Sequence, residues 1–248
     1  GLGLFEGRKC VVTPGIVECG VLEEKINGEL GRRIAGEQLD FVILVGDTLV
    51  GIVKKGYFST VRIGGIIGYL YGTSNSRGLH NHKSATINVD VDVTGGALCV
   101  GGIASGLRDA LDAPKSGEPA NGNDADIFVT GSTKTTFDVG GIIATANNYN
   151  RYNATNNGNI TITGATVGTD LRVGGIECSR NYGAKNINYV NNGDVFIDST
   201  TKVQGSVSVG GFAGGNGPMS VASAQTYDGC YNTGDITFSG EAGLSGTG

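Results

Sequence analysis

Two histidines and a set of aspartates are the residues of this chain best suited to metal chemistry. His80 and His82 are separated by one residue, and no cluster that would supply a third ligand lies near them in the sequence. Since a catalytic zinc site uses three protein ligands, a turn tip is the favoured interpretation of this pair. The acids that could offer oxygen ligands to Ca²⁺ are Asp124, Asp126, Asp194, Asp198 and Asp235. Their spacing fits neither a helix-loop-helix site nor a nine-residue calcium repeat, so we interpret them as solvated turn acids, with Ca²⁺ as the alternative and no other cofactor.

Catalysis finds little support in the residue pattern. A Ser-His-Asp triad would have to use one of the two histidines, and neither is accompanied by a G-x-S-x-G turn. A polysaccharide-active enzyme needs carboxylates together with Arg or Lys in one cleft, and the pairs Asp170/Arg172 and Lys134/Asp138 supply only pieces of one. We therefore expect no enzymatic activity and keep a polysaccharide-active β-helix enzyme as the last alternative.

The five cysteines form no C-x-x-C pair, so the sequence offers no zinc or redox framework. Cys10 and Cys19 flank Pro14-Gly15, a plausible hairpin, and could pair in an oxidising compartment. An odd number leaves at least one free thiol, and buried reduced thiols are slightly favoured over disulfides. The remaining cysteines are Cys99, Cys178 and Cys230.

Loops that mix Asn with Tyr are the candidate binding surface. Exposed Tyr offers rigid contact area at low entropic cost, while Asn fits turns or stacks in ladders. The candidate binding residues are Tyr149, Asn150, Tyr152, Asn153, Tyr182 and Tyr189. Packing in the core is the favoured interpretation of the tyrosines, and contact with a sugar or a protein is the alternative.

The elements that must position these residues follow from a repeat. Alternating apolar residues followed by Gly-Gly occur at 61–66, 98–103, 137–142, 171–176 and 207–212. The first glycines lie at positions 64, 101, 140, 174 and 210, and a recurrence of this length is typical of solenoids and propellers. The alternation predicts a strand with one apolar face. Gly-Gly indicates a bend, because glycine reaches positive φ without steric cost.

A second, strand-like triplet follows each copy of the motif, at 87–89, 127–129, 160–162, 195–197 and 236–238. The outward threonines of these triplets are interrupted by Asn88, Phe128 and Phe196, which argues against a flat ice-binding array. The interval from a triplet to the next motif is nearly constant, whereas the interval from a motif to its triplet varies. In a stacked array core strands keep register while loops differ, so we expect the variable half to carry the binding surface.

The last copy resembles a known family. V-G-G-F-A-G at 209–214, followed by C-Y-N-T-G-D-I at 230–236, is similar to the GLUG motif of bacterial cell-surface and adhesin-like proteins. The third and fourth copies keep N-N-G but place Ala154 and Tyr189 where the Cys falls, and the first two copies lose the turn. The resemblance covers residues 60–240 or so. It implies an extracellular β-repeat domain, a β-solenoid, and no catalytic residues.

Residues 1–56 lack the repeat. Leu22, Ile26, Leu30 and Ile34 recur every four residues, which predicts an amphipathic helix. Strands are expected at 41–45 and 49–53, around a Gly46-Asp47 turn. Since the first coil of a solenoid would otherwise expose an open edge, we expect 1–56 to cap an array that spans 57–248.

Composition limits the function classes. The net charge of −5 lacks the clustered Lys and Arg of a nucleic-acid surface, and no apolar run of 18 residues predicts a membrane span. Gly1 at the start suggests a mature or trimmed chain.

We thus predict an all-β protein, a parallel β-solenoid of about five repeats with an N-terminal cap; a β-propeller is the alternative, although its blades usually have four strands. The predicted function is non-enzymatic, adhesin-like binding of a host protein, matrix protein or glycan through the variable loops, outside the cell or on its surface. A structural spacer, or a filament subunit that associates with itself into a fibre, is the alternative.

Overall fold

The computed structural model describes residues 10–13, 26, 29–30, 41–45, 60–70, 76–107, 111–146, 151–180, 185–216 and 226–243. Within these residues the chain is all-β apart from helical positions at 26, 29 and 30, and every paired strand runs parallel to its neighbour. Among the helices of this described part, none is long and apolar enough to cross a membrane.

The strands form four parallel sheets. Sheet A contains, in order, β1 (Cys10–Thr13), β2 (Phe41–Val45), β3 (Thr60–Gly64), β7 (Ala97–Gly101), β11 (Phe137–Gly140), β16 (Leu171–Gly174) and β21 (Val207–Gly210). Sheet B contains β6 (Thr86–Val93), β10 (Asp126–Thr133), β14 (Ile160–Ile162), β19 (Val195–Ile197) and β25 (Ile236–Phe238). In addition, β15 (Thr166–Val167) pairs with the C-terminal end of β10, and β20 (Lys202–Val203) pairs with β15.

The other two sheets are made of shorter strands. Sheet C contains β4 (Ile67–Leu70), β8 (Ala104–Leu107), β12 (Ile143–Ala146), β17 (Glu177–Arg180) and β22 (Ala213–Asn216). Sheet D contains β5 (His80–Asn81), β9 (Asn121–Asn123), β13 (Arg151–Asn156), β18 (Lys185–Asn191), β23 (Thr226–Asp228) and β24 (Tyr231–Asn232).

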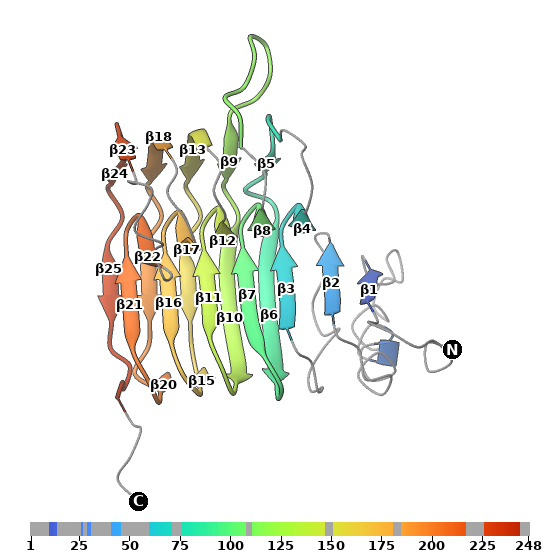
Figure 1. Cartoon of the computed structure of the whole chain (residues 1–248), viewed down its shortest axis with the longest axis vertical. Coiled ribbons are helices and arrows are strands. Elements are labelled where there is room, and N and C mark those ends of the chain that lie inside the picture. Colours follow the sequence, from blue (N-terminus) through green and yellow to red (C-terminus); the bar gives the residue numbers. More distant parts are fainter. Residues whose placement is uncertain are drawn as a thin grey trace, which may run out of the picture.

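Each coil passes through the sheets in the order A, C, D and B and then returns to sheet A one strand further along (Figure 1). The predicted parallel β-solenoid is therefore confirmed. The propeller alternative is wrong, because equivalent strands of successive repeats pair with each other in parallel. The five V-G-G strands delimit four complete coils, and their valine positions lie in one register, from Ile63 through Val100, Val139 and Val173 to Val209.

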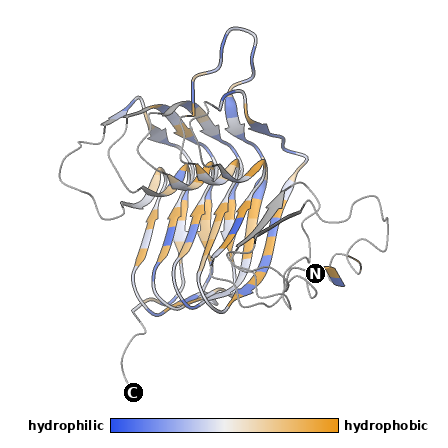
Figure 2. Cartoon of the chain, turned by 45° about the vertical axis from the view of Figure 1, so that its right-hand side comes forward, coloured by the Kyte–Doolittle hydropathy of each residue, from blue (hydrophilic) through white to orange (hydrophobic). Residues whose placement is uncertain are grey.

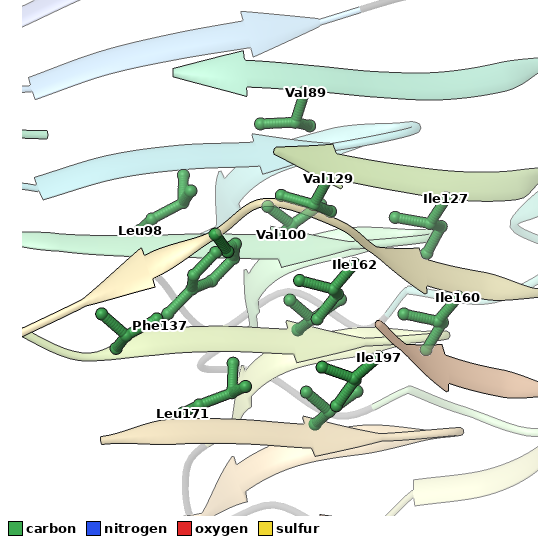
Figure 3. Packing of buried hydrophobic residues seen from close by; sticks show 14 of the residues in the cluster. Val89, Leu98, Val100, Ile127, Val129, Phe137, Ile160, Ile162, Leu171 and Ile197 are labelled. Atoms are coloured by element: carbon green, nitrogen blue, oxygen red, sulfur yellow. The ribbon is translucent and has the colours of Figure 1, made fainter. Parts of the chain in front are cut away.

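Two apolar cores hold the coils together. The first lies between sheets A and B, where side chains such as Leu98, Phe137 and Leu171 stack in columns along the solenoid (Figure 3). Apolar and polar residues alternate along these strands (Figure 2). The second core lies between sheets C and D and receives the residue after each Gly-Gly, such as Ile142 and Ile176. The odd spacing from Val173 to Ile176 thus reflects a change of core.

The glycines of the motif bend the chain as predicted, but the reason is close approach and not positive φ. Gly101 and Gly102 are absent from the positions with left-handed φ. A Cβ atom on Gly101 would overlap the carbonyl oxygen of Ala104, and one on Gly102 would overlap Gly141 of the next coil and the side chain of Asn123. Glycine is needed because the bend packs backbone against backbone.

The N-terminal segment is described in part. The predicted strand at 41–45 is confirmed as β2, which pairs in parallel with β1 and β3 and so lies against the edge of the first repeat. Leu30 of the predicted helix packs against the first core. The strand expected at 49–53 and the Pro14-Gly15 turn lie outside the described residues.

Candidate functional site

The six predicted binding residues fall in different environments. Tyr149, Asn150 and Tyr182, and the side chain of Tyr152, lie outside the described part of the structure. Tyr189 is 1% exposed, because it takes an inward position of β18 and packs edge-on against Phe212 in the second core, with ring centroids 6.0 Å apart. The prediction that Tyr189 contacts a ligand is therefore wrong, and its packing interpretation is confirmed.

Asn153 lies within strand β13 of sheet D and has a left-handed backbone. Its φ is 50°, and Asn188, the equivalent residue one coil further on, has a φ of 55°. Asn188 Nδ2 donates a hydrogen bond to Asn153 Oδ1 at 3.0 Å, and Gly229 repeats the left-handed conformation in the last coil. Asparagine and glycine suit this position because both tolerate a left-handed backbone. The position thus has a structural explanation, and its role in binding stays a prediction.

An asparagine ladder, buried except for its last member, lies at the corner between sheets D and B. Its members are Asn81, Asn123, Asn156, Asn191 and Asn232. Each side-chain amide donates to the amide oxygen of the next, at 2.6 to 3.1 Å. Four members also donate to the carbonyl two residues ahead, as Asn156 does to Gly158 at 2.8 Å. The N-x-G turns of the last three coils were its signal in the sequence, whereas Asn81 and Asn123 lack the glycine.

The ladder explains why residues 121–123 are not part of an exposed loop. The polar stretch before them is exposed from Lys115 to Ala120 and projects beyond the coils (Figure 1). Asn121 and Asn123, in contrast, are both 0% exposed in β9. The exposed loop therefore ends before β9, because Asn123 must be buried to bond Asn81 and Asn156 of the adjacent coils.

The outward face of sheet B is the most distinctive exposed surface of the described coils. Its central row runs across the strands in register: Asn88, Phe128, Thr161, Phe196 and Thr237. Because Ile127 and Val129 fill the core, Phe128 between them must point outward. Phe128 is 41% exposed and Phe196 is 43% exposed. They are two strands apart, about 9.6 Å, with Thr161 between them.

Carboxylates border this aromatic row on the same face. Asp90 accepts a hydrogen bond from the Thr130 hydroxyl at 3.0 Å, and Asp92 accepts one from the Ser132 hydroxyl at 2.6 Å. Beyond Phe196 the hydrogen bonds from Thr200, at 2.7 and 2.8 Å, hold the pKa of Asp198 below its ordinary value. The face therefore combines two exposed rings with carboxylate hydrogen-bond acceptors.

The residues weighed as metal ligands bond to other groups of the protein. His80 Nε2 lies 2.9 Å from Asp124 Oδ2, whereas His82 Nδ1 lies 3.0 Å from the hydroxyl of Ser84. Asp126 and Asp194 each accept a backbone N–H of the next coil, from Asn159 and Asp235, at 2.8 Å. In the part of the chain that the structure describes, no three His, Cys, Asp or Glu side chains group as metal ligands would.

Two of the residues considered for catalysis, Asp138 and Arg172, form a partly buried ion pair instead of an open cleft. Arg172 donates to both carboxylate oxygens of Asp138 at 2.8 and 2.9 Å, and Asp138 is 3% exposed. Burial raises the pKa of Asp138, and the Arg172 guanidinium offsets only part of that effect. Asp170 instead accepts the hydroxyl of Ser206, at 2.6 Å.

This ion pair belongs to a polar layer between sheets A and C. Arg62, in the same row of sheet A, lies over the ring of Tyr69 at 4.6 Å and donates to the Thr145 hydroxyl at 3.3 Å. Cys99 and Cys178 are buried free thiols at this layer, in agreement with the expectation of buried reduced cysteines, and Cys230 is half-buried. Burial, followed by the charge of Asp138, raises the pKa of Cys99 to about 12. Pairing of Cys10 with Cys19 lies outside the described residues.

Comparison of the chain with protein-family models, with curated proteins and with solved structures found no match in any of the three.

Proposed function

We propose that this protein is a non-enzymatic, adhesin-like binding domain that works outside the cell or on its surface, and that the outward face of sheet B holds an extended glycan chain. The observation that carries the proposal is the pair of exposed rings, Phe128 and Phe196, on a regular parallel sheet. The GLUG-like motif supports the extracellular part of the proposal.

A glycan suits this face on chemical grounds. Sugar rings present apolar C–H faces, which pack against aromatic rings, and they carry hydroxyls around their edges. Asp90, Asp92 and Asp198 accept hydrogen bonds from hydroxyls, and the Thr161 hydroxyl between the rings can donate one. A polymer that crosses the strands meets the same spacing from coil to coil, so weak contacts add through high effective concentration.

The proposed face differs from the one that the sequence favours. It lies in the constant half of each repeat, where register is kept, and not in the variable loops. A role for the loop residues Tyr149, Asn150, Tyr152, Asn153 and Tyr182 remains a prediction beside it.

The proposal is tested by affinity electrophoresis in gels that contain soluble polysaccharides. The variant Phe128→Ala/Phe196→Ala should lose about tenfold to a hundredfold in affinity, since each ring contributes about 0.5 to 1.5 kcal/mol. Tyr231→Ala, which removes an exposed ring from sheet D and not from sheet B, is the matched control and should bind as the parent does. Unchanged retardation of the double variant would contradict the proposal, as would release of reducing ends from the polymer, which would favour the enzyme alternative.

A spacer or filament subunit is the second candidate function. One observation favours it: equivalent strands of successive coils pair in parallel and in register, which makes the array a regular spacer.

A further inference from the structure

Each exposed ring on the outward face of sheet B has a carboxylate two residues before it. Asp126 precedes Phe128 in β10, and Asp194, directly before β19, precedes Phe196. Residues two apart in a strand point to the same face and lie about 6.6 Å apart along it. Each ring and its carboxylate therefore form a pair on the surface.

Backbone hydrogen bonds hold these carboxylates in one row. Asp126 Oδ1 accepts the N–H of Asn159 at 2.8 Å, and Asn159 Oδ1 accepts that of Asp194 at 2.9 Å. Asp194 Oδ1 accepts the N–H of Asp235 at 2.8 Å. Each bond uses one side-chain oxygen, and a carboxylate has a second oxygen that can accept from a ligand. The coil between the two rings makes the same bond with a neutral amide, so the bond itself does not require a charge.

Carboxylates also dominate the surroundings of the rings. In the strands of sheet B and directly beside them, the described acids are Asp90, Asp92, Asp126, Asp194, Asp198 and Asp235. The described cations of the same set are Lys134 and Lys202. Lys202 lies in the row of Ser132, four residues or about 13 Å beyond the row of the rings, and Lys134 follows β10 still further along. The surface next to the rings is therefore negatively charged.

Building on the glycan-binding function proposed above, we propose that the glycan is a polycation, a chain of sugars with protonated amino groups, and that an ammonium lies between each ring and its carboxylate. An ammonium is attracted both to a carboxylate and to the face of an aromatic ring, and the separation within each pair lets it contact both. A neutral sugar would use the ring and leave the charge of the carboxylate without a counterpart. Uronic acids and sulfated sugars would be repelled.

The spacing of the pairs suits alternate sugars of an extended chain. Phe128 and Phe196 lie two strands apart, about 9.6 Å, with Thr161 between them. A sugar of a β-1,4-linked chain is about as long as the distance between neighbouring strands, and alternate sugars carry their amines on the same side of the chain. A chain that crosses the strands therefore brings one amine to each ring–carboxylate pair and places the intervening sugar over Thr161.

Isothermal titration calorimetry with one oligomer in two forms measures the preference for charge. Soluble chitosan oligomers carry an amine on each sugar, and N-acetylation of the same oligomers removes the charge but keeps the sugar rings. In a mildly acidic buffer of low salt, the parent should bind the amine form about tenfold tighter than the N-acetylated form. Added salt should reduce this preference. An oligogalacturonate of similar length, which is anionic, should not bind.

A charge-removing variant tests the two carboxylates. Asp126→Asn/Asp194→Asn keeps both Oδ1 acceptors, as Asn159 does in the coil between them, so it should fold as the parent does and bind the two forms of the oligomer equally. Asp112→Asn/Asp228→Asn is the matched control. It changes the net charge by the same amount away from sheet B, since Asp228 lies in β23 and the carbonyl of Asp112 accepts a bond from β9. The control should keep the preference of the parent.

The possible failures are distinguishable. If the parent binds both forms of the oligomer equally, or if Asp126→Asn/Asp194→Asn keeps the preference, the assignment of a cationic glycan is wrong and the glycan-binding function still stands. If neither form binds and the polysaccharide gels show no retardation, both proposals are wrong. If a lysine oligomer of similar length binds as tightly as the amine form, the face recognises charge alone, which contradicts a sugar ligand.

Discussion

In the repeats, both faces of sheet A are covered by other sheets, but their chemistry is opposite. One face turns Val61, Leu98, Phe137, Leu171 and Val207 toward sheet B, in one register. The other turns Arg62, Cys99, Asp138, Arg172 and Ser208 toward sheet C, again in one register. An alternating pattern in a strand therefore does not by itself identify a solvent-exposed face.

The difference indicates a division of roles. The apolar face is similar in every coil, and each fully buried Val or Leu contributes about 1.5 to 3 kcal/mol to stability. The polar face changes from coil to coil and needs directional partners, as Asp138 needs Arg172. We hypothesise that the apolar face supplies most of the stability, whereas the polar face favours particular neighbours in the stack. The substitutions below test this division.

The largest effect is expected on the apolar face. Val173→Asp buries a carboxylate between sheets A and B with no cation beside it, which costs several kcal/mol, so the coils should unfold cooperatively. Thermal unfolding followed by circular dichroism measures the loss. Thr161→Asp, at an outward position of sheet B, is the control and should change stability by less than about 1 kcal/mol. A well-folded Val173→Asp protein would refute the stacked core.

On the polar face, Asp138→Ala should cost about 1.5 to 3 kcal/mol, because it removes the carboxylate that the partly buried Arg172 guanidinium bonds twice. The double variant Asp138→Leu/Arg172→Met should recover most of that stability, since an apolar pair needs no partner. Chemical denaturation of the two variants compares them. If the double variant is as unstable as the single one, the loss of stability does not come from the unpaired Arg172 charge alone, and other contacts of the polar layer contribute to it.

The sequence predicts the apolar face well and the polar face poorly. Val100, Val139 and Val173 recur with Gly-Gly at nearly constant spacing, so their stacking could be expected. Sheet C could not, because its strands share no pattern: Ile67–Leu70 is apolar, whereas Glu177–Arg180 is mostly polar. Without sheet C, the residues at Arg62 and Asp138 look solvent-exposed.

The candidate site shows the same limit. The outward orientation of Phe128 and Phe196 follows from a two-residue period, so both rings could be placed from the sequence. The sequence alone did not show that these two rings form a binding face, because there they only interrupted a row of outward threonines. Core packing was the favoured interpretation of Tyr189, but its inward position depends on pairing with Ala154 in the adjacent coil, which the sequence alone does not show.

A smaller effect, on rate and not on stability, is expected at the thiols of the polar layer. Cys99 is 2% exposed and has a pKa of about 12, so it should resist thiol-specific reagents at pH 8 in the native protein. Cys230, which is half-buried, should react first. Mass spectrometry of peptides after timed alkylation separates the sites. Labelling of Cys99 as fast as Cys230 would show that sheet C does not cover this face.

The smallest effect is expected at the exposed corner where the chain enters sheet A. The side-chain hydrogen bond from Ser206 holds the pKa of Asp170 below its ordinary value of 3.8, against a slight rise from burial. A carboxyl group with a lowered pKa contributes stability that is present above pH 3.8 and is lost as the pH falls through the folded value. In Ser206→Ala the pKa of Asp170 should move up toward 3.8, and acid should reduce stability from a higher pH.

Carboxyl titration by NMR measures the Asp170 shift directly, and Ser208→Ala in β21 is the control. Ser208 lies in the polar row of sheet A and gives no hydrogen bond to Asp170 among the described contacts, so its variant should leave this pKa unchanged. If both variants move the pKa equally, the general packing of the coil, and not the Ser206 hydroxyl, sets it. In that case the corner depends on burial in the same way as the two covered faces of sheet A do.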